Sequence, residues 1–144
     1  MRRLLIVIAI AFALIAPTTP AQAHHEDKYT ATYMKKHNSG LTVQQIQQNL
    51  AGFGYYTGLV DGDFGPKSRL AAAVHQDDWG HVNTKASVKR LQKIVGANQD
   101  GWYGPLTKDK VRQWQRKKGL HADGIAGRKT RTAMGLPVCQ CGGH

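Results

Sequence analysis

The 144-residue chain has little cysteine, and this shortage excludes one class of small protein. Its two cysteines, Cys139 and Cys141, lie close together near the C-terminus. They cannot cross-link a core, so the chain is not a scaffold held together by several disulfides. Their spacing allows a small local disulfide ring or pairing with another chain, and the sequence does not choose between these two.

Long apolar runs are also scarce. An uncharged apolar run over residues 4–16 follows a basic start and precedes the small-x-small triplet Ala21-Gln22-Ala23. This order predicts a secretory signal peptide over residues 1–23, with a retained membrane anchor as the alternative. The run is short for a membrane span of roughly 20 residues, which favours cleavage. We therefore expect a secreted or wall-associated protein, extracellular or periplasmic, with no transmembrane segment after cleavage.

Acidic side chains are few and unevenly placed. The chain has 9 acidic and 20 Lys and Arg residues, a formal charge of +11. Residues 41–87 hold three basic and four acidic groups, whereas residues 88–134 hold twelve basic and three acidic ones. A concentrated positive field favours an anionic partner. For an exported chain this predicts an anionic wall polymer or a membrane surface and argues against nucleic acid.

Catalytic constellations are missing from the sequence. There is no Ser-His-Asp order, no nucleophile elbow and no clear pair of catalytic carboxylates, and the glycine turns lack the lysine and the strand of a phosphate loop. Weak metal-ligand candidates exist for zinc or copper: His75, Asp77, Asp78 and His81; Cys139, Cys141 and His144; and His24 with His25. A structural interpretation is simpler in each case, with His75 in the core and its acidic neighbours in a solvated connection. We predict no catalytic residue, no metal and no cofactor.

An apolar stripe occurs twice. Residues 24–40 are polar and lack a sustained period, which predicts a flexible arm. Val43, Ile46 and Leu50 then lie at i, i+3 and i+7, which predicts a short helix capped by Thr42. The stripe recurs 45 residues later as Val88, Leu91 and Val95, with Ser87 as the expected cap, and a glutamine follows the middle residue in both copies (Gln47 and Gln92).

A turn motif occurs three times. The segments DGDFGPKS (61–68), DGWYGPLT (100–107) and DGIAGRKT (123–130) all fit D-G-x-x-G-x-x-[ST]. In each, the first glycine suits a positive φ, the second is an acceptable helix N-cap, and proline in two copies suits the first helical position. The Ser or Thr is expected to reach back to the cap. The predicted structural turn residues are Asp61, Gly62, Gly65, Asp100, Gly101, Gly104, Asp123, Gly124 and Gly127.

A helix is expected after each turn. Residues 70–76 and 108–118 fit, the latter with Val111 and Trp114 on a buried face, and a short helix fits up to about Met134. The aromatic rings of Phe64 and Tyr103 are expected to point into the core. The predicted fold is therefore all-α, a small bundle of short helices with internal duplication. It has a partial repeat over 41–85, a complete repeat over 86–136 and a Cys/Gly tail over 137–144.

Several of these motifs together resemble a known family. They are Val88-x-x-Leu91-Gln92, the 100–107 turn, Val111-x-x-Trp114-Gln115, Gly119-Leu120 and the 123–130 turn. The ensemble is similar to the small peptidoglycan-binding domain of bacterial and phage wall-lytic enzymes. Residues 43–76 look like a second, partial copy, in which His75 replaces an aromatic residue and no second turn follows.

The resemblance implies a compact helical module that holds a protein on the cell wall, in a family normally tethered to a catalytic domain. Since the repeats and the arm use the whole predicted mature chain, we expect a non-catalytic protein that binds peptidoglycan or an anionic wall polymer. The alternatives are a minimal metal-dependent wall amidase or peptidase, and an accessory subunit or inhibitor of a wall-lytic enzyme. The expected ligand-binding residues are Trp102, Tyr103, Lys108, Arg112, Tyr55 and Tyr56, with Trp102 pointing outward and Tyr103 inward.

Overall fold

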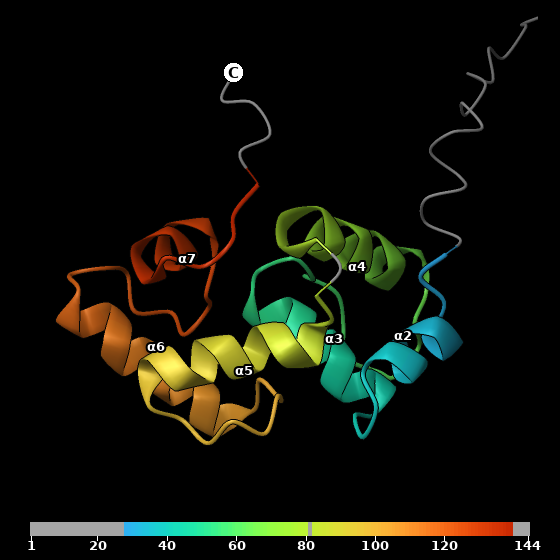
Figure 1. The fold of residues 1–144 in the computed structure, drawn as a ribbon, viewed down its shortest axis with the longest axis horizontal. Helices are drawn as coiled ribbons and strands as arrows, with labels where there is room; N and C mark the ends of the chain where they lie inside the picture. The colour runs from blue at the N-terminus through green and yellow to red at the C-terminus, as the bar shows by residue number, and fades with distance from the viewer. Residues whose placement is uncertain (1–27, 81, 140–144) are drawn as a thin grey trace, which may run out of the picture.

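The computed structural model describes residues 28–80 and 82–139, and over these ranges the fold is all-α. The described part contains six helices and no strand (Figure 1). They are α2 (Ala31–His37), α3 (Val43–Gly52), α4 (Pro66–Trp79), α5 (Thr84–Val95), α6 (Pro105–Lys117) and α7 (Arg128–Met134). The expected bundle of short helices is confirmed. The predicted signal peptide and the residues His24, His25, His81, Cys141 and His144 lie outside the described residues.

Helix α5 joins the two halves of the molecule. It packs against α3 on one side and α6 on the other, while α3 also contacts α2 and α4 (Figure 1). None of the helices in residues 28–80 and 82–139 has the length and apolar character needed to span a membrane. The fold is a set of short helices, and the connections between the helices determine how they lie relative to one another.

Part of the expected flexible arm is helical instead. Thr30 caps α2, and Tyr29 and Met34 are buried in the first core cluster. The buried side chain of Asn38 accepts hydrogen bonds from the Thr84 hydroxyl (2.7 Å) and from the backbone N–H of Lys85 (3.0 Å). A search for a sustained apolar period misses a helix of only seven residues, because its stability comes from these tertiary contacts.

Each turn is held by a buried glutamine from the preceding helix, an arrangement we call the glutamine clamp. In the second turn, Gln92 Nε2 donates to Asp100 Oδ1 (2.8 Å), to the Trp102 carbonyl (3.0 Å) and to Thr107 Oγ1 (2.9 Å). Gln92 Oε1 accepts the backbone N–H of Gly101 at 2.9 Å. One amide therefore fixes both ends of an eight-residue turn.

The same clamp occurs in the other two turns. Gln47 bonds Asp61, the Asp63 carbonyl, Ser68 and the N–H of Gly62. Gln115 bonds Asp123, the Ile125 carbonyl, Thr130 and the N–H of Gly124. All three glutamines are fully buried or nearly so. The three clamps explain why glutamine recurs after the middle apolar residue. The sequence showed this recurrence but not the hydrogen bonds that account for it.

The turn chemistry is confirmed in part. Gly62, Gly101 and Gly124 have positive φ, and Pro66 and Pro105 stand at the start of α4 and α6. The hydroxyl of the Ser or Thr does not cap the helix, because it points at the glutamine of the preceding helix instead. The N-cap glycines are Gly65, Gly104 and Gly127, none with a side-chain cap.

Two details of the predicted helices are corrected: the cap of α5 and the end of α4. Thr42 caps α3 as expected, with a full capping box, but α5 is capped by Asn83. Ser87 lies inside α5, where it bonds the Asn83 carbonyl at 3.0 Å. Helix α4 extends past Gln76 to Trp79, so Asp77 and Asp78 are helical and do not lie in a solvated connection.

Two buried clusters form the core, and the repeats share them. The inward slots of the turns are filled by Phe64 and Tyr103, as expected, and in the third turn by Ala126. Phe53, from the end of the first repeat, lies in the second cluster and packs edge-on against Tyr103 with ring centroids 5.9 Å apart. Trp114 was expected in this core, but it is half-buried and lies beneath the Lys118 ammonium, 5.7 Å from the ring centroid.

Asn49 fastens the second turn to the first repeat. Its side chain donates to the Gly101 carbonyl at 2.9 Å and accepts the N–H of Tyr103 at 2.7 Å. A further bond joins the third turn to the same helix, since the Ala126 N–H donates to the Gly52 carbonyl at 2.7 Å. The end of α3 is therefore the common support for the second and third turns.

Candidate functional site

A groove of about 480 Å³ lies where the end of α3 meets the second and third turns. This volume falls within the range of ordinary ligand pockets, roughly 300–1,000 Å³. The first repeat supplies part of α3 and the loop after it, and the second repeat supplies two turns and the start of α6. The lining residues are Gln48, Ala51, Gly52, Tyr56, Thr57, Gly58, Tyr103, Gly104, Pro105, Lys108, Gly124 and Ile125.

Two tyrosine rings in the groove lie against bare glycine backbone. A Cβ on Gly52 would come within 2.3 Å of the Tyr103 ring, and one on Gly58 within 2.5 Å of the Tyr56 hydroxyl. The Tyr103 hydroxyl donates to the Gly124 carbonyl (2.8 Å), and that of Tyr56 to the Leu59 carbonyl (2.7 Å). Burial raises the pKa of Tyr103. Because both hydroxyls are satisfied internally, the rings offer mainly carbon surface to a ligand.

The groove brings together three of the six predicted ligand-binding residues: Tyr56, Tyr103 and Lys108. Trp102 was expected to point outward. Instead it is half-buried, packs against the first core cluster and donates its indole N–H to Gln48. Its ring also lies within 3.0 Å of the position of a Cβ on Gly104. Trp102 therefore supports the wall of the groove through its contacts with Gln48 and Gly104, two of the lining residues.

The other two predicted residues lie outside the groove lining. Arg112 packs its stem beside Gly124 and pairs with Asp109 at 3.0 Å on the exposed side of α6. Tyr55 lies on a different face, beside Arg131. Sequence reasoning did not select Gln48, Ala51 or Thr57, because they become groove residues only when the first repeat docks on the second.

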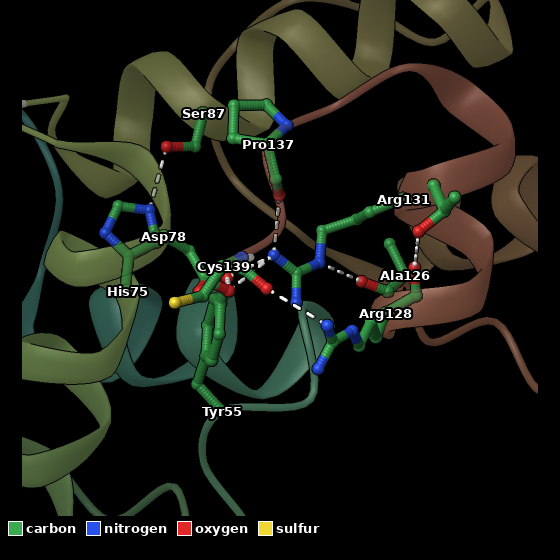
Figure 2. Close-up of polar contacts among 10 residues, drawn as sticks. Tyr55, His75, Asp78, Ser87, Ala126, Arg128, Arg131, Pro137 and Cys139 are labelled. Atoms are coloured by element: carbon green, nitrogen blue, oxygen red, sulfur yellow. Dashed lines mark hydrogen bonds and ion pairs between the residues drawn. The ribbon is translucent and has the colours of Figure 1, made fainter. Parts of the chain in front are cut away.

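Tyr55 forms hydrogen bonds with both members of a buried ion pair that ties the C-terminal segment to α4 (Figure 2). Arg131 Nη1 lies 2.8 Å from Asp78 Oδ2, and the two side chains are only 5% and 8% exposed. Arg131 also donates to the Pro137 carbonyl at 2.8 Å, and Asp78 Oδ1 accepts the N–H of Cys139 at 2.9 Å. The disulfide-bonded Cys139 is thereby held on α4.

Hydrogen bonds set the ionisation of this pair. Burial alone would raise the pKa of Asp78, but the hydrogen bonds from Tyr55 and Arg131 and the guanidinium charge hold it below its ordinary value. Burial, together with the hydrogen bond to Asp78, raises the pKa of Tyr55. Asp78 therefore stays a carboxylate beside a charged guanidinium and is committed to a structural contact.

His75 is also committed to structure. Its Nε2 lies 2.8 Å from Ser87 Oγ, and its ring stacks on Trp79 with centroids 5.8 Å apart. Burial, with the nearby Arg131 charge, lowers the pKa of His75 to about 3. Within residues 28–80 and 82–139, no three His, Cys, Asp or Glu side chains gather as they would to hold a metal ion.

A family described as "Putative peptidoglycan binding domain" matches residues 39–78 and 83–134. The chain belongs to the peptidoglycan-binding domain family. Comparisons with curated proteins and with solved structures found no match. The first matched segment contains α3 and all but the last residue of α4, and the second contains α5, α6 and α7.

Both matched segments of this family member contribute to the groove, and the family supports binding to the wall polymer. The family resemblance seen in the sequence is confirmed. In the first repeat, α4 is followed by a short connection to α5 in place of a second turn. The third turn packs back onto α3, so the first repeat is completed by its neighbour.

The buried His75 predicts a pH dependence of stability. Its folded pKa is about 3, whereas histidine in an unfolded chain titrates near 6.5. Below pH 6.5 the unfolded state binds the proton and the folded state does not, so stability falls as pH falls. The expected slope is about 1 kcal/mol per pH unit between pH 6 and 4.5.

Urea unfolding at several pH values measures this slope. A His75→Gln variant keeps a polar partner for Ser87 but cannot titrate in this window, so the slope should fall by about 1 kcal/mol per pH unit, leaving the smaller contribution of carboxylates such as Asp78. The exposed His121 is the control, and His121→Gln should leave the slope unchanged. Equal slopes for wild type and His75→Gln would show that His75 is not held neutral.

Proposed function

We propose that the protein is an exported, non-catalytic binder of peptidoglycan that holds the polymer in the groove between its repeats. The observation that carries this proposal is the composition of the groove. It combines tyrosine carbon surface, glycine backbone and one lysine, and each repeat supplies part of it. Wall polymers present alternating apolar and polar faces, which suit aromatic rings with a few polar groups nearby.

The side chains that a metal-dependent peptidase would use are engaged in structural contacts, which supports binding over hydrolysis. A metal peptidase would need His75 and its acidic neighbours to face a ligand. His75 is buried against Trp79 and Ser87, and Asp78 is paired with Arg131. Freeing either group would break a buried contact, so we propose no hydrolytic reaction at this cluster.

The proposal is tested by sedimentation with purified sacculi. We expect the chain from residue 24 onward to pellet with sacculi at low salt and to remain largely bound at moderate salt. Attraction by the basic second repeat alone would fade steeply as salt rises. Recovery of the protein in the supernatant at low salt would contradict peptidoglycan binding.

Blocking the groove should abolish this binding. Thr57 is exposed and lines the groove, so Thr57→Trp should fill part of the space without disturbing the core. We expect retention on sacculi to fall at least about tenfold, the equivalent of about 1.4 kcal/mol. The matched control is Thr132→Trp on the exposed side of α7, which should bind normally. Equal binding by both variants would place the site elsewhere.

A further inference from the structure

The groove carries a single formal charge. Among its twelve lining residues, Lys108 is the one ionisable group of either sign apart from the two tyrosines, and none is a carboxylate. This contrasts with the charged outer surface of the second repeat, where arginine and lysine side chains are numerous. A ligand that enters the groove thus meets one ammonium group in an otherwise neutral setting.

The stem of Lys108 is positioned by the third turn. A Cβ on Gly124 would lie 2.7 Å from Lys108 Cγ and 3.1 Å from its carbonyl oxygen, so only a glycine leaves room for this stem. Gly124 has a φ of +77°, which glycine also adopts most readily. The Gln115 clamp fixes Gly124 in turn, through a 2.9 Å bond to its N–H. The lysine is therefore aligned along the groove by backbone that cannot easily move.

The Lys108 ammonium is available to a ligand. In the part of the chain that the structure describes, it makes no hydrogen bond or ion pair. Its neighbour Arg112 is paired with Asp109, and Arg131 is paired with Asp78. A charged donor without a protein partner, placed on a neutral groove, is suited to a single anionic group on a ligand.

We propose that the groove binds the peptide stems of peptidoglycan, with Lys108 pairing a stem carboxylate, and that it does not bind the glycan strand. This inference rests on the proposed function and names the part of the polymer that is recognised. The N-acetylated glycan backbone is uncharged, whereas the stems carry free carboxylates and small methyl side chains. One ammonium beside tyrosine rings and glycine backbone matches a carboxylate next to small apolar groups.

An anionic phosphate polymer fits the groove less well. Polyphosphodiesters carry a charge on every repeat unit and bind surfaces that present several cations together. The groove offers one cation, and the remaining basic residues lie outside its lining. Binding of such a polymer is therefore treated as an outcome that would overturn the proposal.

Three soluble probes test the assignment by calorimetric or NMR titration of the full chain. They are a synthetic stem pentapeptide with free carboxylates, the same peptide with every carboxylate amidated, and an N-acetylglucosamine tetramer. We expect the free peptide to bind at least about tenfold more tightly than the amidated one, the usual scale for one charge-assisted contact. The tetramer should bind more weakly still.

Variants of α6 isolate the role of the lysine. Lys108→Gln should weaken binding of the free peptide about tenfold and leave binding of the amidated peptide unchanged. Lys108→Arg, which keeps the charge, should restore most of the affinity. Lys110→Gln is the matched control, because Lys110 is exposed on the same helix and outside the groove lining.

The contrary outcomes separate this inference from the proposed function. Retention on sacculi together with equal binding of both peptides, tighter binding of the tetramer, or no binding of the free peptide would overturn the stem assignment alone. Retention that disappears when anionic wall polymers are stripped from the sacculi would also overturn it. Failure to bind sacculi at all would remove the proposed function itself.

Discussion

Replacing Gln92 with leucine should destabilise the protein by about 3–5 kcal/mol. Gln92 is fully buried and holds four groups of the second turn, including the buried N–H of Gly101 and the hydroxyl of Thr107. Leucine has a similar size but leaves the buried Gly101 N–H without its partner, at a cost of about 1–3 kcal/mol, and removes the donor from three acceptors, at about 1 kcal/mol each. Since small domains are stable by only about 5–15 kcal/mol, the loss should be plain in urea unfolding followed by circular dichroism.

Two further variants separate the hydrogen bonds from the packing. Gln113→Leu makes the same change at an exposed position of α6 and should alter stability by no more than about 0.5 kcal/mol. Gln92→Glu keeps the shape but replaces the N–H donor that faces Asp100 with a carboxylate oxygen, so it should be destabilised at neutral pH and recover in part when protonated. A Gln92→Leu variant within 1 kcal/mol of wild type on the urea scale would mean that the clamp is not a major support.

Asp78→Asn should cost about 3–5 kcal/mol, because it leaves the Arg131 guanidinium buried without its counter-charge. The pair is separated by 2.8 Å and is almost entirely shielded from solvent. Asparagine keeps the volume and the acceptor for the Cys139 N–H, so the loss reports mainly on charge. Urea unfolding near pH 7 measures it.

The chain offers a surface pair as the matched control. Arg112 and Asp109 lie 3.0 Å apart, but their side chains are 37% and 61% exposed. Exposed pairs contribute about 0–1 kcal/mol, so Asp109→Asn should be nearly neutral. The double variant Asp78→Leu/Arg131→Met removes both charges and should regain much of the stability lost by Asp78→Asn. A loss from Asp78→Asn no larger than that from Asp109→Asn would contradict a buried ionic link.

The local structure was largely predictable from the sequence. The helix-starting glycines, the prolines at the first helical position and the inward Tyr103 follow from backbone preferences that act over a few residues. The duplicated stripe revealed α3 and α5. The recurring glutamine was visible in the sequence, but the clamp was not, because a periodic pattern does not identify the hydrogen-bond partners of a buried amide.

The groove was predictable only in part, for a physical reason. Tyr103 and Lys108 come from one turn and the helix that follows it, so local spacing places them together. Ala51 and Thr57 join them only because Asn49 and Gly52 dock the turns onto α3 across about fifty to seventy-five residues of sequence. Trp102 illustrates the limit, since alternation along the turn predicted an outward ring and contact with Gln48 turned it inward.

The central claim is that one groove built by both repeats binds the wall polymer. NMR of the isotopically labelled chain, titrated with soluble peptidoglycan fragments, tests it most directly because every amide reports separately. The account predicts that the largest shifts fall in residues 51–58, 103–108 and 124–125, which come from both repeats. Shifts confined to the outer basic surface of α5 and α6, with residues 51–58 unaffected, would contradict it.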